Sequence, residues 1–468
     1  NENFSYRTNS NIYVDYKILD NLTFSTKWGV DFLNFREHAY ESTKTVQGAK
    51  YNGLGFETYS NVTNIVSNNL LKYKNKFGNH KLEVLAGYSF ESYEFRSSFI
   101  RGQDFADDNL EYISSAATIV SASADALDSG LRSFLGRANY NYKDKYIATF
   151  SGRFDTSTKF GENNRTGFFP AGSLAWRISE ESFMDNVKAI SDFKLRLSYG
   201  LTGNDDISPF LFSELYGNTS YGGQPAIYPS NIPNPDLKWE STAQLNVGIN
   251  LGLFKNRITL TADYYNKQTD DLLLSRPLPS SSGFSSITEN VGKVENQGLE
   301  ISIASQNFIG DAFTWNTQFN ISGNKNKVLE LYNGQPIDDI GRGGNRIMEG
   351  QPIGIFYSYK SLGVDPSTGD IVFADTNFDG VITSEDRTIV GNPHPDFIAG
   401  LTNNFNYKGL DLSIFLQGSY GNDVFNGSRL FLESLQGGDN QLESVTRRWR
   451  QPGDITDMTE EVETNPGW

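Results

Sequence analysis

The stretch Phe193-Lys-Leu-Arg-Leu-Ser-Tyr-Gly-Leu-Thr-Gly203 decides the fold class of this chain. Its side chains alternate in character: the apolar ones are Leu195, Leu197, Tyr199 and Leu201, and those between them are Lys194, Arg196, Ser198 and Gly200. Because successive side chains of a β-strand point to opposite faces, this alternation makes one face fit for lipid and the other for water. We interpret the stretch as an amphipathic strand of about ten residues, the length that a tilted strand needs to cross a bilayer.

The same period of two recurs along the chain and comes in pairs. Further alternating segments cover residues 244–251 and 313–322. Short polar turns that join two such segments are expected at residues 19–21, 77–80, 143–145, 254–257, 309–311 and 408–409. These pairs are predicted to be β-hairpins. Residues 168–178 and 193–202 form another pair, whose longer connection has room for a helical turn at 181–186.

Long polar stretches separate the hairpins. They cover residues 34–62, 94–130, 203–240, 268–295 and 324–395. Short turns at one end of the strands and long loops at the other are typical of outer-membrane barrels, whose short turns face the periplasm. We therefore predict an all-β fold, a transmembrane antiparallel β-barrel with about 14 strands in this chain, short periplasmic turns and long extracellular loops.

Composition narrows the function classes. The 468 residues include 13% aromatics, 44 Gly and no Cys, which excludes disulfides, zinc–thiolate sites and thiol nucleophiles. No apolar run approaches the roughly 18 residues of a membrane helix, so a chain of this kind spans a membrane only as a barrel. The formal net charge of −16 argues against nucleic acid as a partner.

A soluble β-rich protein stays open as an alternative, for example a secreted or surface-exposed adhesin or glycan-binding protein. Its strands would alternate in the same way. Long strands favour the membrane barrel, and so do aromatic residues near strand ends, which suit the interfacial girdles of a barrel. These aromatic residues are Tyr140, Tyr142, Tyr146, Phe154, Tyr264 and Tyr407.

The segment Asp375-Thr-Asn-Phe-Asp-Gly-Val-Ile-Thr-Ser-Glu-Asp386 has the pattern of a calcium loop. Its candidate ligands are the side chains of Asp375, Asn377, Asp379, Thr383 and Asp386 and the backbone carbonyl of Val381. Hard oxygens at these spacings, with Gly380 for the sharp turn, suit Ca²⁺. Asp386 stands where the pattern usually has Glu, and no helix is expected before the loop. An Asx-rich turn that needs no metal is the alternative, and a bound Ca²⁺ would order the loop.

No catalytic residue is predicted. The three histidines, His38, His80 and His394, are far apart in the sequence, and neither His-Glu-x-x-His nor Gly-x-Ser-x-Gly occurs. A carboxylate pair of the glycosidase type needs a defined separation in space, which the sequence does not supply. We therefore expect no enzyme, and release of product from a glycan would be the observation that contradicts this.

Several motifs resemble those of the SusC/RagA family of TonB-dependent transporters in Bacteroidota. They follow one another in the order Gly152-Arg-Phe-Asp-Thr-Ser-Thr-Lys-Phe-Gly161, Gly167-Phe-Phe-Pro-Ala-Gly-Ser-Leu-Ala-Trp-Arg177, Leu195-Arg-Leu-Ser-Tyr-Gly-Leu-Thr-Gly-Asn204, Asn234-Pro-Asp-Leu-Lys-Trp-Glu240, Asp263-Tyr-Tyr265, Asn290-Val-Gly-Lys-Val-Glu-Asn-Gln-Gly298, Gly391-Asn-Pro-His-Pro-Asp-Phe397 and Arg448-Trp-Arg-Gln-Pro-Gly-Asp454. The resemblance extends over almost the whole chain.

This resemblance implies a barrel of about 22 strands, a plug domain with a TonB-contacting segment, and a SusD-like lipoprotein over the extracellular mouth. Residues 1–468 then form a partial barrel, and we expect the plug domain and the terminal strands to lie outside this chain. The implied function is active import of an oligosaccharide or oligopeptide through the bacterial outer membrane, energised through TonB. The loop residues Tyr216, Tyr221 and Tyr228 are candidates for stacking on sugar rings, or for packing within the loop or against the lipoprotein.

Overall fold

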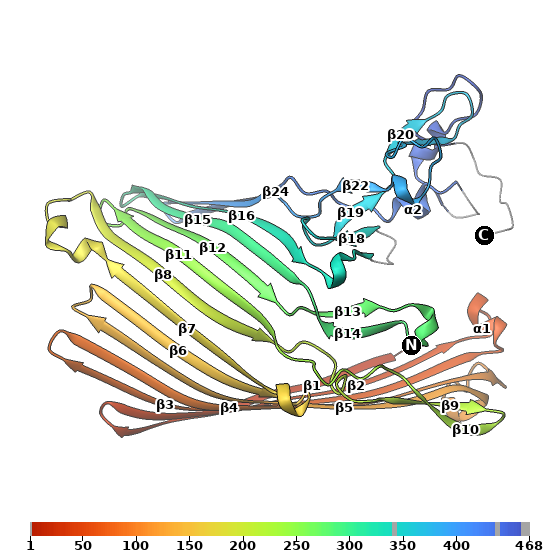
Figure 1. Ribbon diagram of the computed structural model, residues 1–468, viewed down its shortest axis with the longest axis horizontal. Helices are drawn as coiled ribbons and strands as arrows, with labels where there is room; N and C mark the ends of the chain where they lie inside the picture. Colours follow the sequence, from red (N-terminus) through yellow and green to blue (C-terminus); the bar gives the residue numbers. More distant parts are fainter. Residues whose placement is uncertain (1, 339–343, 436–439, 460–468) are drawn as a thin grey trace. The chain divides into compact units, whose positions relative to one another are not determined.

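The computed structural model describes residues 2–338, 344–435 and 440–459, and strands dominate this part of the chain (Figure 1). Fourteen strands form one large sheet, in the order β1-β2-β3-β4-β5-β6-β7-β8-β11-β12-β15-β16-β23-β24. Their bounds are β1 Glu2–Leu19, β2 Leu22–Glu41, β3 Leu54–Phe77, β4 His80–Phe105, β5 Ala116–Tyr142, β6 Tyr146–Ser157, β7 Thr166–Arg177, β8 Ile190–Asn204, β11 Glu240–Leu253, β12 Ile258–Asp270, β15 Lys293–Ile309, β16 Phe313–Glu330, β23 Phe397–Tyr407 and β24 Leu410–Tyr420. The prediction of a large antiparallel sheet is confirmed.

Every predicted hairpin is present in this sheet, because each short turn lies where the polar residues interrupt the alternation. Lys408 and Gly409, for example, join β23 to β24 with positive φ angles of 46° and 88°. Two such residues give the backbone twist that a tight hairpin needs. The helical turn expected at residues 181–186 is a 3₁₀ turn, Ser182–Met184.

The strands of the first hairpins are longer than the sequence predicts. The expected loops at residues 34–62 and 94–130 are mostly strand, because β2 continues to Glu41, β3 starts at Leu54, β4 continues to Phe105 and β5 starts at Ala116. These two loop predictions are wrong for a physical reason. Beyond the apolar band a strand keeps its backbone pairing but has no lipid to face, so the alternation that marks a strand in the sequence disappears.

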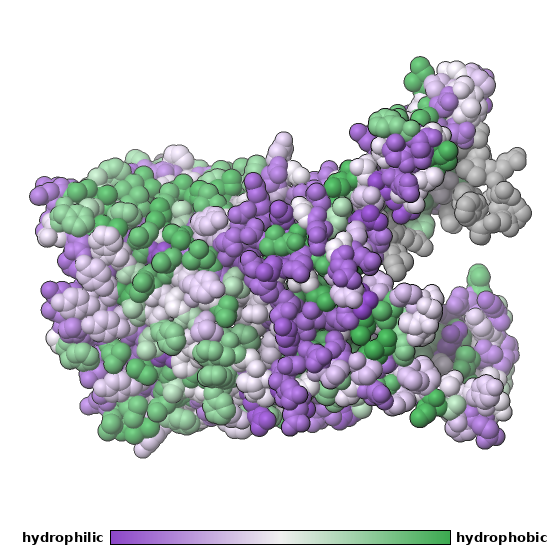
Figure 2. Space-filling view, viewed as in Figure 1, coloured by the Kyte–Doolittle hydropathy of each residue, from purple (hydrophilic) through white to green (hydrophobic). Residues whose placement is uncertain are grey.

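Strand β4 shows this change along a single face. Its alternating apolar side chains run from Leu82 to Phe90 and give way on the same face to Glu94 and Arg96. Arg96 pairs there with Asp128 of β5 at 2.6 Å. Figure 2 shows the same trend over the strands: apolar side chains gather toward the short turns, and hydrophilic ones take over toward the loops.

The remaining elements lie between the long strands. Two hairpins occupy the loops that follow β8 and β12, namely β9 Tyr216–Tyr221 with β10 Gln224–Pro229, and β13 Leu273–Pro277 with β14 Ser286–Asn290. After β16 come a small sheet of β17 Ile337–Asp338, β18 Asn345–Ile347, β19 Ile355–Ser358 and β22 Thr388–Gly391, and a hairpin of β20 Ser361–Val364 and β21 Ile371–Phe373. The three later predicted loops therefore leave the main sheet as expected.

The described helices are short. The α-helices are α1 Val46–Lys50 and α2 Arg429–Leu432, and the 3₁₀ turns are Ile113–Ser115, Glu162–Asn164, Ile178–Glu180, Ser182–Met184, Ser280–Ser282, Tyr332–Gly334, Ser384–Asp386 and Glu443–Arg447. None of these helices has the length and apolar character to cross a membrane.

The chain divides into two compact units. Unit 1 comprises residues 1–187, 194–245 and 271–290, and unit 2 comprises residues 188–193, 246–270 and 291–468. A single-layer sheet leaves both faces partly exposed, so the buried apolar side chains gather where loops cover strand ends. Among the described residues they are Leu54, Phe105, Phe160 and Leu237 in unit 1 and Val294, Val328, Leu331, Ile355 and Met458 in unit 2.

Candidate solute-facing site

The strand register of unit 2 sorts side chains into an apolar face and a polar face. One row across five strands is entirely apolar: Leu260, Ile303, Phe319, Leu401 and Leu416 lie opposite one another in turn. The next row is Thr261, Ser302, Asn320, Gly400 and Gln417, and it belongs to the other face. In a membrane barrel the apolar face meets lipid and the polar face lines the lumen. The polar row therefore lies on the side that would face the lumen of such a barrel.

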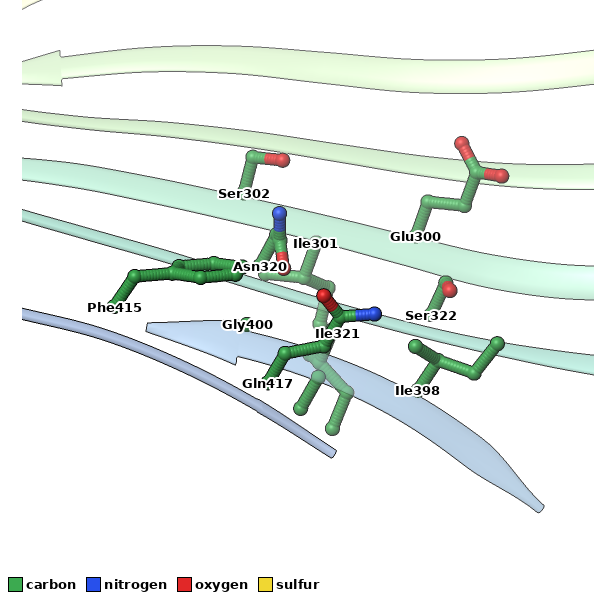
Figure 3. A pocket seen from close by; sticks show the side chains of 11 residues that line it. Glu300, Ile301, Ser302, Asn320, Ile321, Ser322, Ile398, Gly400, Phe415 and Gln417 are labelled. Atoms are coloured by element: carbon green, nitrogen blue, oxygen red, sulfur yellow. The ribbon is translucent and has the colours of Figure 1, made fainter. Parts of the chain in front are cut away.

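A hollow of about 430 Å³ opens on β15, β16, β23 and β24 of this unit (Figure 3). Its lining residues are Glu300, Ile301, Ser302, Asn320, Ile321, Ser322, Ile398, Ala399, Gly400, Phe415 and Gln417. Figure 3 shows the amide groups of Asn320 and Gln417 between the Phe415 ring on one side and Ile398 on the other. The polar lining thus combines one carboxylate, two amides and two hydroxyls beside an aromatic ring.

Gly400 is the residue that keeps the hollow open. A Cβ atom added to Gly400 would lie 2.6 Å from Oδ1 of the opposite Asn320, far inside van der Waals contact. Any larger residue would therefore push the Asn320 amide out of its place. Because Gly400 has no side chain, the space beside Asn320 is left open and the surface of the two strands is concave there.

A chain of amides connects this part of the wall to the loops. The Tyr265 hydroxyl donates to Oδ1 of Asn324 at 3.0 Å, and Nδ2 of Asn324 donates to Oδ1 of Asn296 at 3.1 Å. Asn326 donates to the same Asn296 oxygen at 2.9 Å, while its own Oδ1 accepts the Ile353 backbone N–H at 2.7 Å. These uncharged donors and acceptors hold the loop without adding charge to the polar face.

The polar face of unit 1 carries ion pairs, of which two are examples. Arg7 of β1 donates to Asp31 of β2, with a shortest N–O distance of 2.5 Å. Arg153 lies 2.5 Å from Asp155 on β6 and also donates to the Ser133 hydroxyl at 2.7 Å. Pairs of this kind cancel charge and stabilise the strand register.

The resemblance motifs of unit 1 form a scaffold at the loop end of the strands. Trp239 packs against Phe160 and Phe169, with ring centroids at 5.4 and 5.3 Å, and its indole N–H donates to the Arg165 carbonyl at 3.0 Å. Asn290 donates to the Lys238 carbonyl at 2.8 Å. The segment 234–240 is therefore a structural anchor for loops, and its side chains are largely used in packing.

A second anchor joins β2 to the loop after β4. The Asp108 carboxylate accepts hydrogen bonds from the Tyr40 hydroxyl at 3.0 Å, the Ser42 hydroxyl at 2.8 Å, and the Thr43 backbone N–H and hydroxyl, both at 2.8 Å. These bonds favour the charged carboxylate and lower the pKa of Asp108 to about 2, with the Thr43 backbone N–H as the largest cause. Desolvation raises the pKa of Tyr40 to about 12, and its bond to Asp108 adds to the shift.

The predicted calcium ligands all lie in one loop after the strand β21, Ile371–Phe373. The Asp375 carboxylate accepts the backbone N–H groups of Phe378 at 2.6 Å and Gly380 at 2.8 Å. Oδ1 of Asn377 accepts the Asp379 N–H at 3.0 Å, and Oδ1 of Asp379 accepts the Val381 N–H at 2.8 Å. Gly380 has a φ of +82°, the sharp turn that the pattern requires.

Asp386 differs from the other candidate ligands because it is fully buried. Its two oxygens accept the backbone N–H groups of Thr376 and Thr383, both at 2.8 Å, and the Thr383 bond is the main reason why the pKa of Asp386 is lowered. It closes the two ends of the loop and caps the Ser384–Asp386 turn. Within the described ranges, no three His, Cys, Asp or Glu side chains gather as metal ligands. Calcium binding by Asp375, Asn377, Asp379, Val381, Thr383 and Asp386 stays a prediction.

The three loop tyrosines lie on the β9–β10 hairpin of unit 1 and are all exposed, with Tyr221 at 84%. Tyr228 lies directly opposite Gly217 and its ring covers that glycine, where an added Cβ would be 2.6 Å from the ring. The tyrosines therefore do not form a buried core of the loop, although Tyr228 packs within the hairpin. Their stacking on a sugar or packing against a lipoprotein stays a prediction.

The chain belongs to the TonB-dependent receptor family, a family of receptors and transporters: the model described as "TonB dependent receptor-like, beta-barrel" matches residues 1–426. This barrel fold implies an outer-membrane location, and the resemblance to SusC and RagA is confirmed.

Among the relatives, TonB-dependent receptor P3 of Formosa agariphila is 36% identical over 96% of this chain and 48% of its own length. TonB-dependent receptor SusC of Bacteroides thetaiotaomicron is 32% identical over 89% of this chain and 43% of its own length. The structure of the RagAB peptide transporter matches 99% of this chain and 53% of the solved chain, with a TM-score of 0.89 and 25% identity. The chain spans about half the length of these curated relatives.

Proposed function

We propose that this chain forms the barrel wall of a SusC-like importer that takes up an oligomeric nutrient, an oligosaccharide or an oligopeptide, through the outer membrane. The observation that carries the proposal is the sheet itself, with an apolar face and a polar face that holds a hollow of about 430 Å³. Likeness to the RagAB peptide transporter supports a peptide as one substrate class. The wall and its loops would guide the solute, while TonB would energise passage.

We further propose a SusD-like surface lipoprotein as the partner, with the loop ends of the strands facing outward. The exposed hairpin β9–β10 and the loops anchored by Trp239 and Asp108 supply a surface for such a partner. Copurification of a surface lipoprotein with the tagged full-length protein would support this part. Protease or antibody access to a tag inserted at Gly222 in whole cells tests the orientation.

The test of import is growth and uptake after gene deletion. Cells that lack the gene should lose uptake of one oligomeric substrate, and they should regain it with the full-length gene but not in a strain without TonB. If the protein is found in the soluble extracellular fraction, the alternative of a secreted adhesin replaces the importer. If uptake persists without TonB, energised transport is wrong.

We also propose a structural Ca²⁺ in the loop 375–386. The donor set fits, because the oxygens of Asp375, Asn377 and Asp379 each have lone pairs beyond the backbone N–H groups that they accept. Calcium titration of the full-length protein should protect this loop from proteolysis, and Asp379→Ala should abolish the protection. If the cleavage rate is the same with calcium and with a chelator, the loop is an Asx-rich turn that binds no calcium.

A further inference from the structure

The charge of the hollow on β15, β16, β23 and β24 is one-sided. Among the described residues that line it, Glu300 is the only charged one, and none of them is a lysine or an arginine. Glu300 is an exposed residue of β15. Asp263 of β12 lies directly opposite Glu300 but has an interaction of its own.

Lys267 of β12 lies on the same face of the sheet as Glu300. Its ammonium lies 4.9 Å from the centroid of the Tyr265 ring, so that it is held over an aromatic ring two positions from Asp263. On β24, Asp411 is an acidic residue of the same face, and it accepts a hydrogen bond from Asn406. Among the described lining residues, Glu300 alone brings a charge to the hollow, and that charge is negative.

The uncharged part of the lining suits an organic cation. The amide oxygens of Asn320 and Gln417 and the hydroxyls of Ser302 and Ser322 can accept N–H hydrogen bonds. The Phe415 ring is 61% exposed, and a cation is attracted to the face of such a ring. A neutral sugar would use the same amides and hydroxyls, so Glu300 is the group that distinguishes a cationic solute from a neutral one.

We propose that this hollow receives a cationic group of the imported solute, a primary ammonium or a guanidinium, with Glu300 as its counter-ion and Phe415, Asn320 and Gln417 around it. The inference rests on the proposed function, because it names the charge class of the solute that the importer takes. It favours basic oligopeptides or amino-sugar oligomers over anionic oligomers of the same size.

The first experiment measures the potential in the hollow without any transport. The chain has no Cys, so Ser322→Cys places a single thiol there in the full-length protein, with any cysteine outside this chain replaced by serine. Reaction rates are compared for two methanethiosulfonates, one carrying trimethylammonium and the other sulfonate. The cationic reagent should react faster, and Glu300→Gln should lower the ratio of the two rates at least threefold, from a charge interaction of about 0.7 kcal/mol or more.

Glu295→Gln is the matched control for this measurement. It removes the same charge from the same strand, at a position where the carboxylate accepts a hydrogen bond from Asn266. The ratio should change much less in this control. A ratio that is near one in the parent protein, or that Glu300→Gln leaves unchanged, would overturn the inference.

The second experiment measures uptake by cells that carry the full-length protein. Trilysine, triserine and triglutamate serve as labelled probes of equal length. Trilysine should enter best, and Glu300→Gln should weaken its uptake about tenfold, the effect expected for a lost charge-assisted hydrogen bond, with little change for triserine. Equal uptake of the three peptides before and after substitution would refute the charge preference while import itself stands. Uptake of no oligomer at all would refute the proposed function, and the labelling ratio would then decide the inference alone.

Discussion

Gly400 and Gly418 lie on adjacent strands and allow the role of the hollow to be tested at a single residue. A Cβ at Gly400 would meet Asn320 at 2.6 Å, whereas a Cβ at Gly418 would meet nothing within 4 Å. Gly400→Ala should therefore displace the Asn320 amide and lower the free energy of unfolding by up to about 1 kcal/mol, because this amide is the end of a side chain that can rotate away. It should also slow uptake. Gly418→Ala should stay within about 0.5 kcal/mol of the parent protein. Thermal unfolding in detergent gives the comparison, and equal effects of the two changes would contradict it.

Asp108 gives the loops of unit 1 a dependence on pH. Because its pKa is lowered to about 2 in the folded state, the stability from its hydrogen bonds is present above the ordinary carboxyl value of about 4. That stability is lost as the pH falls from about 4 to about 2. Proteolysis of residues 42–53 by pepsin should accelerate in this range.

The Asp108→Ala variant should show rapid cleavage of the same loop already at pH 7, measured there with a protease that is active at neutral pH instead of pepsin. Asp20→Asn, at an exposed turn beside Lys17, is the control that should leave the profile unchanged. A parent profile that is flat between pH 4 and pH 2 would mean that Asp108 does not hold the loop.

At the scale of elements, the segment 234–240 anchors the loop end of the strands in unit 1. Trp239→Ala removes the contacts with Phe160 and Phe169 and the hydrogen bond to Arg165. We expect a loss of about 2–4 kcal/mol, somewhat below the cost of truncating a fully buried tryptophan. Tyr221→Ala, which removes an aromatic ring that is 84% exposed, should cost less than about 0.5 kcal/mol. Chemical denaturation of the two variants checks this difference.

The elements also show how far the sequence could be read. The turn at residues 408–409 was predictable because Lys-Gly interrupts a period of two, and the turn sets the register of β23 and β24. The start of β5 at Ala116 could not be predicted, because the side chains of the first half of this strand are exposed to water on both faces. A strand that pairs through its backbone alone, with no apolar face, lacks the period-two alternation by which a strand is recognised in the sequence.

The hollow could not be predicted from the sequence for a different reason. Glu300, Asn320, Gly400 and Gln417 come from four strands, and only the register brings them together. Each residue alone reads as an ordinary polar position of an amphipathic strand. The calcium loop, by contrast, is contiguous, so its residues and its Gly380 turn could be found from spacing alone.

At the scale of the whole molecule, substitution by arginine should have opposite effects on the two faces of the sheet. Leu197 and Ser198 are neighbours on β8, and Leu197 is an exposed residue of the apolar face. Leu197→Arg should destabilise the protein by about 2–4 kcal/mol near the bilayer midplane, whereas Ser198→Arg on the polar face should be tolerated. Folding yield in lipid vesicles gives the readout. Equal tolerance of both changes would exclude a lipid-facing wall and favour a water-soluble sheet.

The length of strands β4 and β5 of unit 1 determines how far they extend beyond the apolar band. A strand of 26 residues such as β4, rising about 3.3 Å per residue and tilted by roughly 40°, extends roughly 65 Å along the barrel axis. The apolar band takes up about 25 Å of that height. Some 40 Å of paired strand, by the same rough reckoning, then lies outside the apolar band. In the importer proposed above, a solute caught at the strand tips would be held far above the apolar band. Capture and passage would then be separated in space, and a label at the tip would report the first without the second.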